Sequence, residues 1–176
     1  MGSEAKQKSP NKGSLYLMSV RSFIRALALA AALGATAASL SACTSTVALE
    51  SAPAANSPRC AAVTVRLPND IDGEAQRPTN AQATSAWGSP TRVILRCGLP
   101  EVLASTLPCV TAGGIDWLVD ASKAPSYRFV TFGRKPATEV IVDSKNASGV
   151  KALDALGLSI SEGIPADRRC TEPASK

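Results

Sequence analysis

The residue with the clearest chemistry in this chain is Cys43, whose thiol follows the short sequence Leu40-Ser41-Ala42. Small residues directly before a cysteine leave room for a signal peptidase, and residues 23–39 supply an apolar run of Ala, Leu and Ile. This arrangement is typical of a bacterial lipobox. It predicts that the chain is cut before Cys43 and that this cysteine carries a diacylglyceryl group and palmitate.

Two alternatives to a cleaved leader exist for residues 23–40. The run approaches the ~20 residues that a transmembrane helix needs, although no basic cluster follows it. A buried helix of a globular domain would instead need a polar face, which the run lacks. The positive charges before the run are Arg21 and Arg25, and translation can start at Met1 or at Met18.

The absence of histidine limits the catalytic chemistry of the chain, because it removes Ser-His-Asp and Cys-His arrangements together with the commonest general base. No phosphate-binding glycine loop and no CxxC pair occurs. Residues 70–74, Asp-Ile-Asp-Gly-Glu, resemble a calcium loop, but the later oxygen ligands are missing, which favours a polar turn. The sequence therefore assigns no catalytic residue, no metal site and no cofactor.

A group of arginine, tryptophan and aspartate residues could bind a ligand if the fold brings them together. Guanidinium groups bind carboxylates or phosphates through paired hydrogen bonds, and an indole ring can stack on either partner. The candidate residues are Arg77, Trp87, Arg96, Asp116, Trp117 and Arg134. The alternative is structural: both tryptophans lie in the core, and Arg96 pairs with Asp116 across two strands.

Asp116 and Asp120 form a second possible site, because they fall on the same side of an expected strand. Two carboxyl groups that face one cleft can hydrolyse a glycosidic bond, usually beside aromatic rings that hold the sugar. The chain has only two Trp, two Tyr and three Phe residues. We therefore expect a binding protein rather than an enzyme. The alternative is a small envelope enzyme that acts on cell-wall precursors without histidine.

The net charge of +5 belongs mostly to the predicted leader. Residues 1–42 contain five basic residues and one acidic residue, whereas 14 basic and 13 acidic residues follow from Cys43 onward. A nearly neutral mature chain lacks the basic surface that binding to nucleic acid requires. Nucleic acid is therefore not an expected partner.

The remaining cysteines, Cys60, Cys97, Cys109 and Cys170, are even in number. In a small exported domain this predicts two disulfides and an oxidising compartment. Three pairings are possible, of which we favour Cys97 with Cys109 and Cys60 with Cys170. Metal ligation is disfavoured because histidine is absent and the spacings do not match zinc sites.

Composition divides the chain into four parts. Residues 1–42 form the N-terminal extension and signal peptide. Residues 43–58 are rich in Ser, Ala, Thr and Pro and predict a flexible tether, which would hold the domain on the order of 20 Å from its anchor. Residues 59–171 form one globular domain, and residues 172–176 form a tail.

Hydrophobic patterning predicts an α+β fold, with a mainly antiparallel sheet of about five strands and one C-terminal helix packed on one face. The expected helix starts after Ser148, ends at Leu156 before Gly157, and turns Val150 and Leu153 toward the sheet. A long loop is expected over residues 69–88. The expected strands are Ala61–Leu67, Thr91–Cys97, Ile115–Asp120, Tyr127–Phe132 and Ala137–Val142.

Several short motifs resemble an actinobacterial family of secreted lipoproteins, known as domain of unknown function 3515. These motifs are Cys60-Ala-Ala-Val, Gln76-Arg-Pro-Thr, Ala86-Trp-Gly-Ser-Pro, Leu95-Arg-Cys-Gly, Asp116-Trp and Thr131-Phe-Gly-Arg. The resemblance covers Cys60 to Cys170 and implies an exported, disulfide-bonded domain anchored in a Gram-positive envelope. It transfers no activity, ligand or catalytic residue.

Together these patterns predict a lipoprotein anchored to the outer face of the cell membrane. We expect it to be a non-enzymatic binding or accessory module of the cell envelope. Its expected partners are the membrane, through the lipid anchor, and an envelope component or membrane protein.

Overall fold

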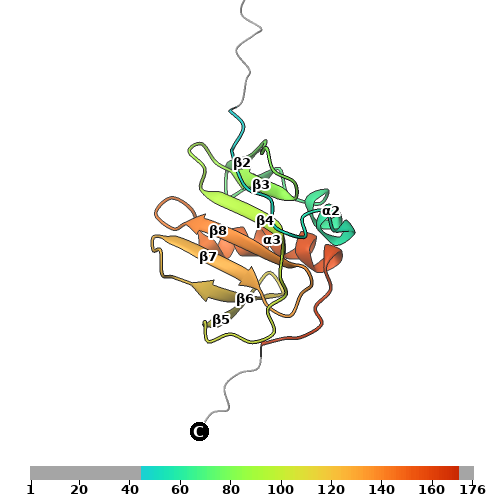
Figure 1. The fold of residues 1–176 in the computed structure, drawn as a ribbon. Helices are drawn as coiled ribbons and strands as arrows, with labels where there is room; N and C mark the ends of the chain where they lie inside the picture. The colour runs from blue at the N-terminus through green and yellow to red at the C-terminus, as the bar shows by residue number, and fades with distance from the viewer. Residues whose placement is uncertain (1–44, 171–176) are drawn as a thin grey trace, which may run out of the picture. The chain divides into compact units, whose positions relative to one another are not determined.

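Eight antiparallel strands and two helices form the fold of residues 45–170 (Figure 1). The computed structural model describes these residues, so the predicted leader, Cys43 and the tail lie outside the described residues. The helices are α2 (Pro58–Thr64) and α3 (Gly149–Gly163). The strands are β1 (Asp70–Ile71), β2 (Glu74–Arg77), β3 (Thr84–Trp87), β4 (Val93–Leu99), β5 (Cys109–Ala112), β6 (Ile115–Asp120), β7 (Ser126–Thr131) and β8 (Ala137–Asp143).

The sheet has the strand order β1-β2-β3-β4-β8-β7-β6-β5. The predicted α+β class, the antiparallel sheet and the C-terminal helix are confirmed, but the structure has eight strands instead of about five. Four expected strands correspond to β4, β6, β7 and β8. The expected loop over residues 69–88 contains β1, β2 and β3 instead, because Asp72 and Gly73 take φ angles of 56° and 84° and close a tight hairpin.

The predicted strand Ala61–Leu67 is wrong, because helix α2 occupies its first half. Pro58 stands at the first helical position, and the Ser57 side chain accepts a hydrogen bond from the Arg59 N–H. Cys60 and Val63 are both buried, and their spacing of three residues fits one helical face. An alternating pattern over a few residues is therefore compatible with a short helix as well.

Helix α3 extends past the predicted end at Leu156 to Gly163. Gly157 does not stop the helix. A Cβ at Gly157 would lie 2.1 Å from the Gly113 oxygen, so this glycine permits close contact with the β5–β6 turn. Leu153 faces the core as expected, whereas Val150 is 66% exposed and the prediction for it is wrong.

The two faces of the sheet are covered differently. Helices α2 and α3 lie on one face and bury the main apolar core with it. The core includes Val63, Trp87, Val93, Leu95, Trp117, Phe129, Val140, Val142, Leu156 and Ile160. The residues that alternate with the core positions on β4 and β8 point to the opposite face, which no helix covers in the described part of the chain.

The N-terminal strap, residues 45–57, lies against the domain instead of forming the predicted flexible tether. Ala52 and Ala55 within it are buried. Gly98 allows close contact with the strap, since a Cβ there would lie 2.5 Å from the Ala55 nitrogen. Hydrogen bonds join the strap to the sheet and its loops at five places. The bonded pairs are Ser45 with Arg77, Val47 with Pro78 and Asn80, Leu49 with Asn80, Ser51 with Gln82, and Ala54 with Gly98.

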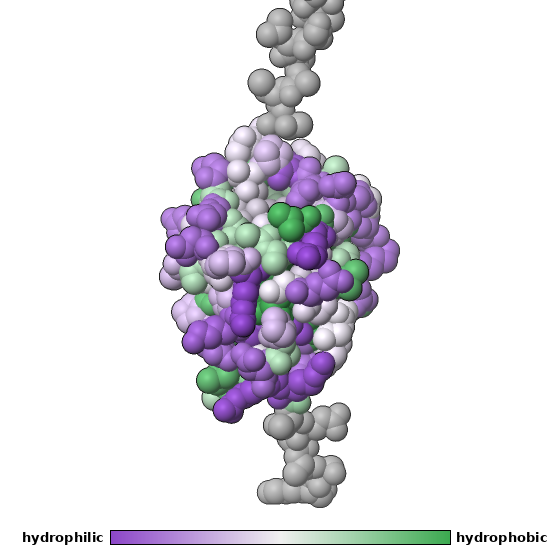
Figure 2. All heavy atoms as spheres, turned by 90° about the vertical axis from the view of Figure 1, so that its right-hand side faces the viewer, coloured by the Kyte–Doolittle hydropathy of each residue, from purple (hydrophilic) through white to green (hydrophobic). Residues whose placement is uncertain are grey.

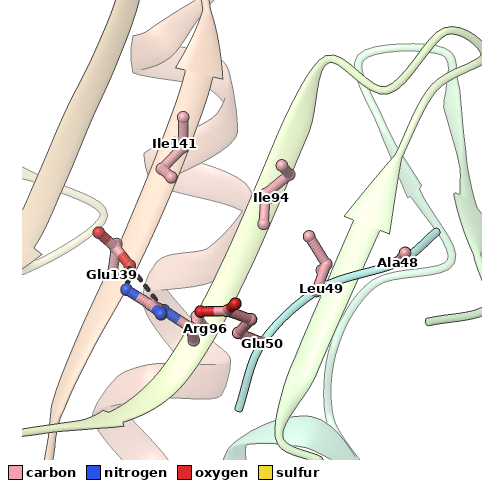
Figure 3. A pocket seen from close by; sticks show the side chains of 7 residues that line it. All are labelled: Ala48, Leu49, Glu50, Ile94, Arg96, Glu139 and Ile141. Carbon is pink, nitrogen blue, oxygen red and sulfur yellow. Dashed lines mark hydrogen bonds and ion pairs between the residues drawn. The ribbon is translucent and has the colours of Figure 1, made fainter. Parts of the chain in front are cut away.

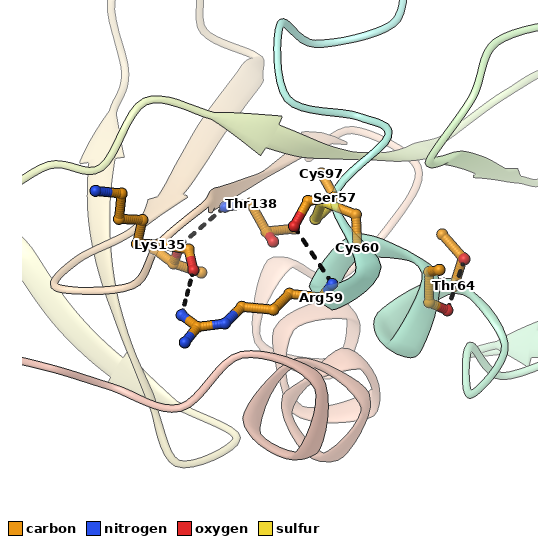
Figure 4. Close-up of a disulfide and its surroundings, with 9 residues drawn as sticks. Ser57, Arg59, Cys60, Thr64, Cys97, Lys135 and Thr138 are labelled. Carbon is orange, nitrogen blue, oxygen red and sulfur yellow. Dashed lines mark hydrogen bonds between the residues drawn. A yellow bond between two sulfur atoms is a disulfide. The ribbon is translucent and has the colours of Figure 1, made fainter.

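The four cysteines form two disulfides as predicted, but the favoured pairing is wrong. Cys60 of α2 bonds to Cys97 of β4 in the core (Figure 4). Cys109 of β5 bonds to Cys170 at the C-terminal end of the described chain. Strands β4 and β5 lie four positions apart in the sheet, about 19 Å at the usual strand spacing, so Cys97 cannot reach Cys109.

Neither described helix has both the length and the hydropathy that crossing a bilayer requires. The apolar run of residues 23–40 lies outside the part of the chain to which this finding applies.

Candidate functional site

An ion-pair cluster of three side chains lies on the uncovered face of the sheet. Arg96 on β4 and Glu139 on β8 are directly paired in the strand register, and Arg128 comes from β7. The Arg96 Nε atom lies 2.8 Å from Glu139 Oε2, and Nη2 lies 2.6 Å from the same oxygen. Arg128 Nε donates to the other carboxylate oxygen, Oε1. Both oxygens of Glu139 are therefore engaged by guanidinium groups.

The burial of this cluster is uneven. The Glu139 side chain is only 3% exposed, whereas Arg96 and Arg128 are 32% and 38% exposed. A carboxylate that is removed from water needs charged partners to offset its lost hydration, which the two arginines provide. Two cations share one anion within the cluster, and the carboxylates of Glu50 and Asp120 and the ammonium group of Lys123 lie in the pockets around it, so positive and negative side chains balance.

A groove adjoins the cluster where the strap crosses the uncovered face (Figure 3). Its first part has a volume of about 480 Å³. Leu49 of the strap and Ile94 of β4 give this part apolar walls, and the Glu50 carboxylate lies beside Arg96. The residues that line it are Ala48, Leu49, Glu50, Ile94, Arg96, Glu139 and Ile141.

A second part of the groove, of about 460 Å³, continues toward the β6–β7 turn and shares Arg96, Glu139 and Ile141 with the first. We call the two parts together the sheet groove. The second part adds Asp120, Ser122, Lys123, Ser126 and Arg128. Hydrogen bonds from Ser122, and then the positive charges of Arg128 and Lys123, lower the pKa of Asp120 below its ordinary value.

The chemistry of the sheet groove suits recognition of an anionic group that carries an apolar part. Arg96 and Arg128 bond to Glu139 through only some of their nitrogen atoms, and both guanidinium groups line the groove. Guanidinium donors of this kind bind a carboxylate or a phosphate. The lowered pKa of Asp120 keeps its carboxyl group ionised at neutral pH, where it cannot donate a proton.

The outer side of the helix layer offers less for a ligand. Figure 2 views the molecule from the side on which α2 lies and shows mainly polar residues, with apolar ones in small groups between them. The most exposed large apolar side chains here are Val65, which directly follows α2, and Val150 and Leu158 of α3. Scattered apolar side chains of this kind are ordinary on protein surfaces.

Of the six predicted ligand-binding residues, only Arg96 lines the sheet groove. Trp87 and Trp117 are fully buried, and their indole N–H groups donate to the carbonyl oxygens of Pro68 and Ala112. The structural interpretation of both tryptophans is therefore the correct one. The expected pair of Arg96 with Asp116 is wrong, because Arg96 pairs with Glu139.

Arg77 and Asp116 hold the two ends of the described chain. Arg77 donates to the carbonyl and hydroxyl oxygens of Ser45 at the start of the strap. Asp116 accepts hydrogen bonds from the Thr111 hydroxyl and from the Cys170 N–H, at 2.8 and 2.9 Å. Both side chains therefore stabilise the ends of the described segment and are absent from the groove lining.

Arg134 is buried and belongs to the fold rather than to the groove. It is 4% exposed and donates to the carbonyl oxygen of Ile164, which follows helix α3. Burial lowers the pKa of Arg134, with a further contribution from the positive charge of Arg169. The six predicted residues thus do not form one cluster.

Arg128 and Glu139 were missed from the sequence, although a signal for them exists. In the predicted strand over residues 137–142, Glu139 and Ile141 alternate with the apolar Val140 and Val142, which places Glu139 on the face opposite the core. That pattern indicates a charged residue on an open face. It does not give the pairing with Arg96 and Arg128, which depends on strand order and register.

Comparisons with known proteins give a family but no activity. No curated protein and no solved structure shows significant similarity to the chain. The model of one family, described as a protein of unknown function (DUF3515), matches residues 22–168, most of the chain. The chain therefore belongs to the DUF3515 family of proteins of unknown function.

Proposed function

We propose that this protein is a lipid-anchored, extracytoplasmic binding module of an actinobacterial cell envelope, and that the sheet groove holds its ligand. The observation that carries the proposal is the Arg96–Glu139–Arg128 cluster beside the strap. It combines guanidinium groups that line the groove with apolar walls from Leu49 and Ile94. These features favour a ligand with a carboxylate or phosphate next to an apolar portion.

Two features support the proposed extracytoplasmic localisation. The lipobox predicts an acylated Cys43 two residues before the described domain begins at Ser45. Two disulfides within one small domain are typical of proteins that fold in an oxidising compartment outside the cytoplasm. The proposed localisation is the outer face of the cell membrane, where the anchor supplies the membrane contact.

The proposal can be tested by photo-crosslinking in intact cells. A photoreactive residue at Ile141, on the floor of both parts of the groove, should capture an envelope component that mass spectrometry then identifies. Adding Arg128→Ala should strongly reduce the capture, because this change removes one of the two guanidinium groups that line the groove. The matched control is Arg66→Ala, which breaks an exposed ion pair between Arg66 and Glu162 of helix α3.

Equal capture by the Arg128→Ala and Arg66→Ala proteins would refute the groove as the binding site. If the captured component were chemically converted by the wild-type protein, the enzyme alternative would replace the binding module.

A further inference from the structure

The start of the strap is fixed to one edge of the sheet. Arg77, the last residue of β2, donates from Nη2 to the Ser45 carbonyl and hydroxyl oxygens at 2.7 and 2.5 Å. Two residues later, the Val47 N–H donates to Pro78 O at 2.9 Å, and Val47 O accepts from the Asn80 N–H at 3.2 Å. The described chain therefore begins at the β1–β2 edge of the sheet (Figure 1).

The proposed anchor lies close to this fixed point in the sequence. Only Thr44 separates Cys43 from Ser45, and two residues of extended chain span at most about 7 Å. A tether over residues 43–58 would instead have given a separation on the order of 20 Å. From this short distance we infer that the domain stands directly on the bilayer, with its β1–β2 edge against the lipid headgroups. This inference rests on the proposed acylation of Cys43.

The charges at the β1–β2 edge balance. Asp72 pairs with Lys151 and Glu74 pairs with Arg92. The remaining two charges are the exposed carboxylate of Asp70 on β1 and the guanidinium group of Arg77, which bonds to neutral oxygen atoms of Ser45, Gly88 and Thr91. The edge therefore has no net charge that would repel it from anionic headgroups.

The strand order then sets the height of each part above the membrane. Seven strand spacings separate β1 from β5, which is about 34 Å at the usual spacing. The sheet groove lies over β4 and β8, at about 14–19 Å from the β1 edge. The β5 edge and the Cys109–Cys170 disulfide occupy the end of the domain that lies farthest from the bilayer.

The experiment uses the full mature protein, purified with its native lipid, in nanodiscs of phosphatidylcholine and phosphatidylglycerol. A gadolinium chelate on some headgroups broadens the NMR signals of nearby amides. The broadening should be strong at Gly73 in the β1–β2 turn and weak at Thr111 in β5. Equal broadening at the two ends would overturn the inference.

Two changes to the chain sharpen this test. A flexible insertion of about ten residues between Thr44 and Ser45 should abolish the gradient, since it adds roughly 17 Å of random reach without touching the domain. Arg77→Ala should weaken the gradient, whereas the control Arg66→Ala should leave it unchanged. A gradient that persists in the insertion variant would contradict the role of the short connection.

Failure of the inference is distinguishable from failure of the proposed function. Intact-mass measurement before reconstitution shows whether Cys43 carries lipid. An unmodified Cys43 refutes both the proposed membrane localisation and the inferred orientation of the domain on the bilayer. Hydrogen exchange at the Val47 and Asn80 amides tests the strap alone. Rapid exchange there with lipid present would refute the inferred orientation, whereas the binding proposal is tested separately by the loss of crosslinking in Arg128→Ala.

Discussion

The two faces of the sheet are stabilised in different ways. On the helix-covered face, Leu95, Val140 and Leu156 interlock in a dry apolar core. On the uncovered face, Arg96 and Glu139 occupy the alternate positions of the same two strands and form an ion pair beside the strap. One pair of strands therefore lines both the apolar core and the proposed binding groove, because successive side chains point to opposite faces.

The largest difference between the faces should appear when apolar side chains are shortened. Leu156→Ala on the covered face should lower the free energy of unfolding by about 2–5 kcal/mol, because it leaves a cavity in the core. Ile141→Ala on the uncovered face should cost only about 1 kcal/mol, since Ile141 is half-buried and water can fill the space. Urea unfolding of the oxidised protein measures both changes, and equal losses would contradict the comparison.

A medium effect is expected for Glu139→Gln, which leaves two guanidinium groups facing each other on the uncovered face. We expect a loss of about 2 kcal/mol, below the value for fully buried pairs because water screens both half-exposed arginines. Glu162→Gln is the matched control, as it breaks the exposed ion pair with Arg66 and should cost under about 1 kcal/mol. A loss at Glu139 as small as that of the control would show that the cluster does not stabilise the sheet.

The smallest effect concerns pH and the exposed Asp120. Its folded-state pKa is lowered, so its contribution to stability is present above the ordinary aspartate value of about 4 and is lost as pH falls through the lowered pKa. Ser122→Ala should raise the pKa of Asp120 part of the way toward the ordinary value, because it removes the hydroxyl hydrogen bond while the backbone N–H of residue 122 still donates to Asp120. NMR titration of the Asp120 carboxyl carbon measures this shift, and an unchanged titration would assign the lowering to the backbone N–H and to the charges of Arg128 and Lys123.

Much of the fold could be predicted from local patterns. Strands β4, β6, β7 and β8 are rich in apolar and β-branched residues, and the Ser148 cap marks the start of α3. The errors lie where local pattern and tertiary contact disagree. Gly157 has the composition of a helix stop but fits against Gly113 inside a longer helix. The Ser- and Ala-rich strap has the composition of a tether, yet hydrogen bonds fix it to the domain.

The site was less predictable than the fold. Of the six residues predicted to bind a ligand, Arg96 alone lines the sheet groove. The sequence shows which residues are arginines but not which side chains lie beside them in the fold. The cluster of Arg96, Glu139 and Arg128 forms because β4 lies beside β8 and β8 beside β7. Arg96 and Glu139 are 43 residues apart in the sequence, so local pattern does not show that they meet. The cysteine pairing was wrong for the same reason: the distance between Cys97 and Cys109 is set by the strand order.

The order of the two disulfides has a consequence for maturation. The bridges follow one another along the chain, Cys60 with Cys97 and then Cys109 with Cys170, so neither encloses or crosses the other. A polypeptide that emerges amino terminus first can oxidise its first pair before the second pair has left the translocation channel. On the export route proposed above, Cys109 and Cys170 emerge after Cys97, so the order of emergence favours the native pairing of Cys60.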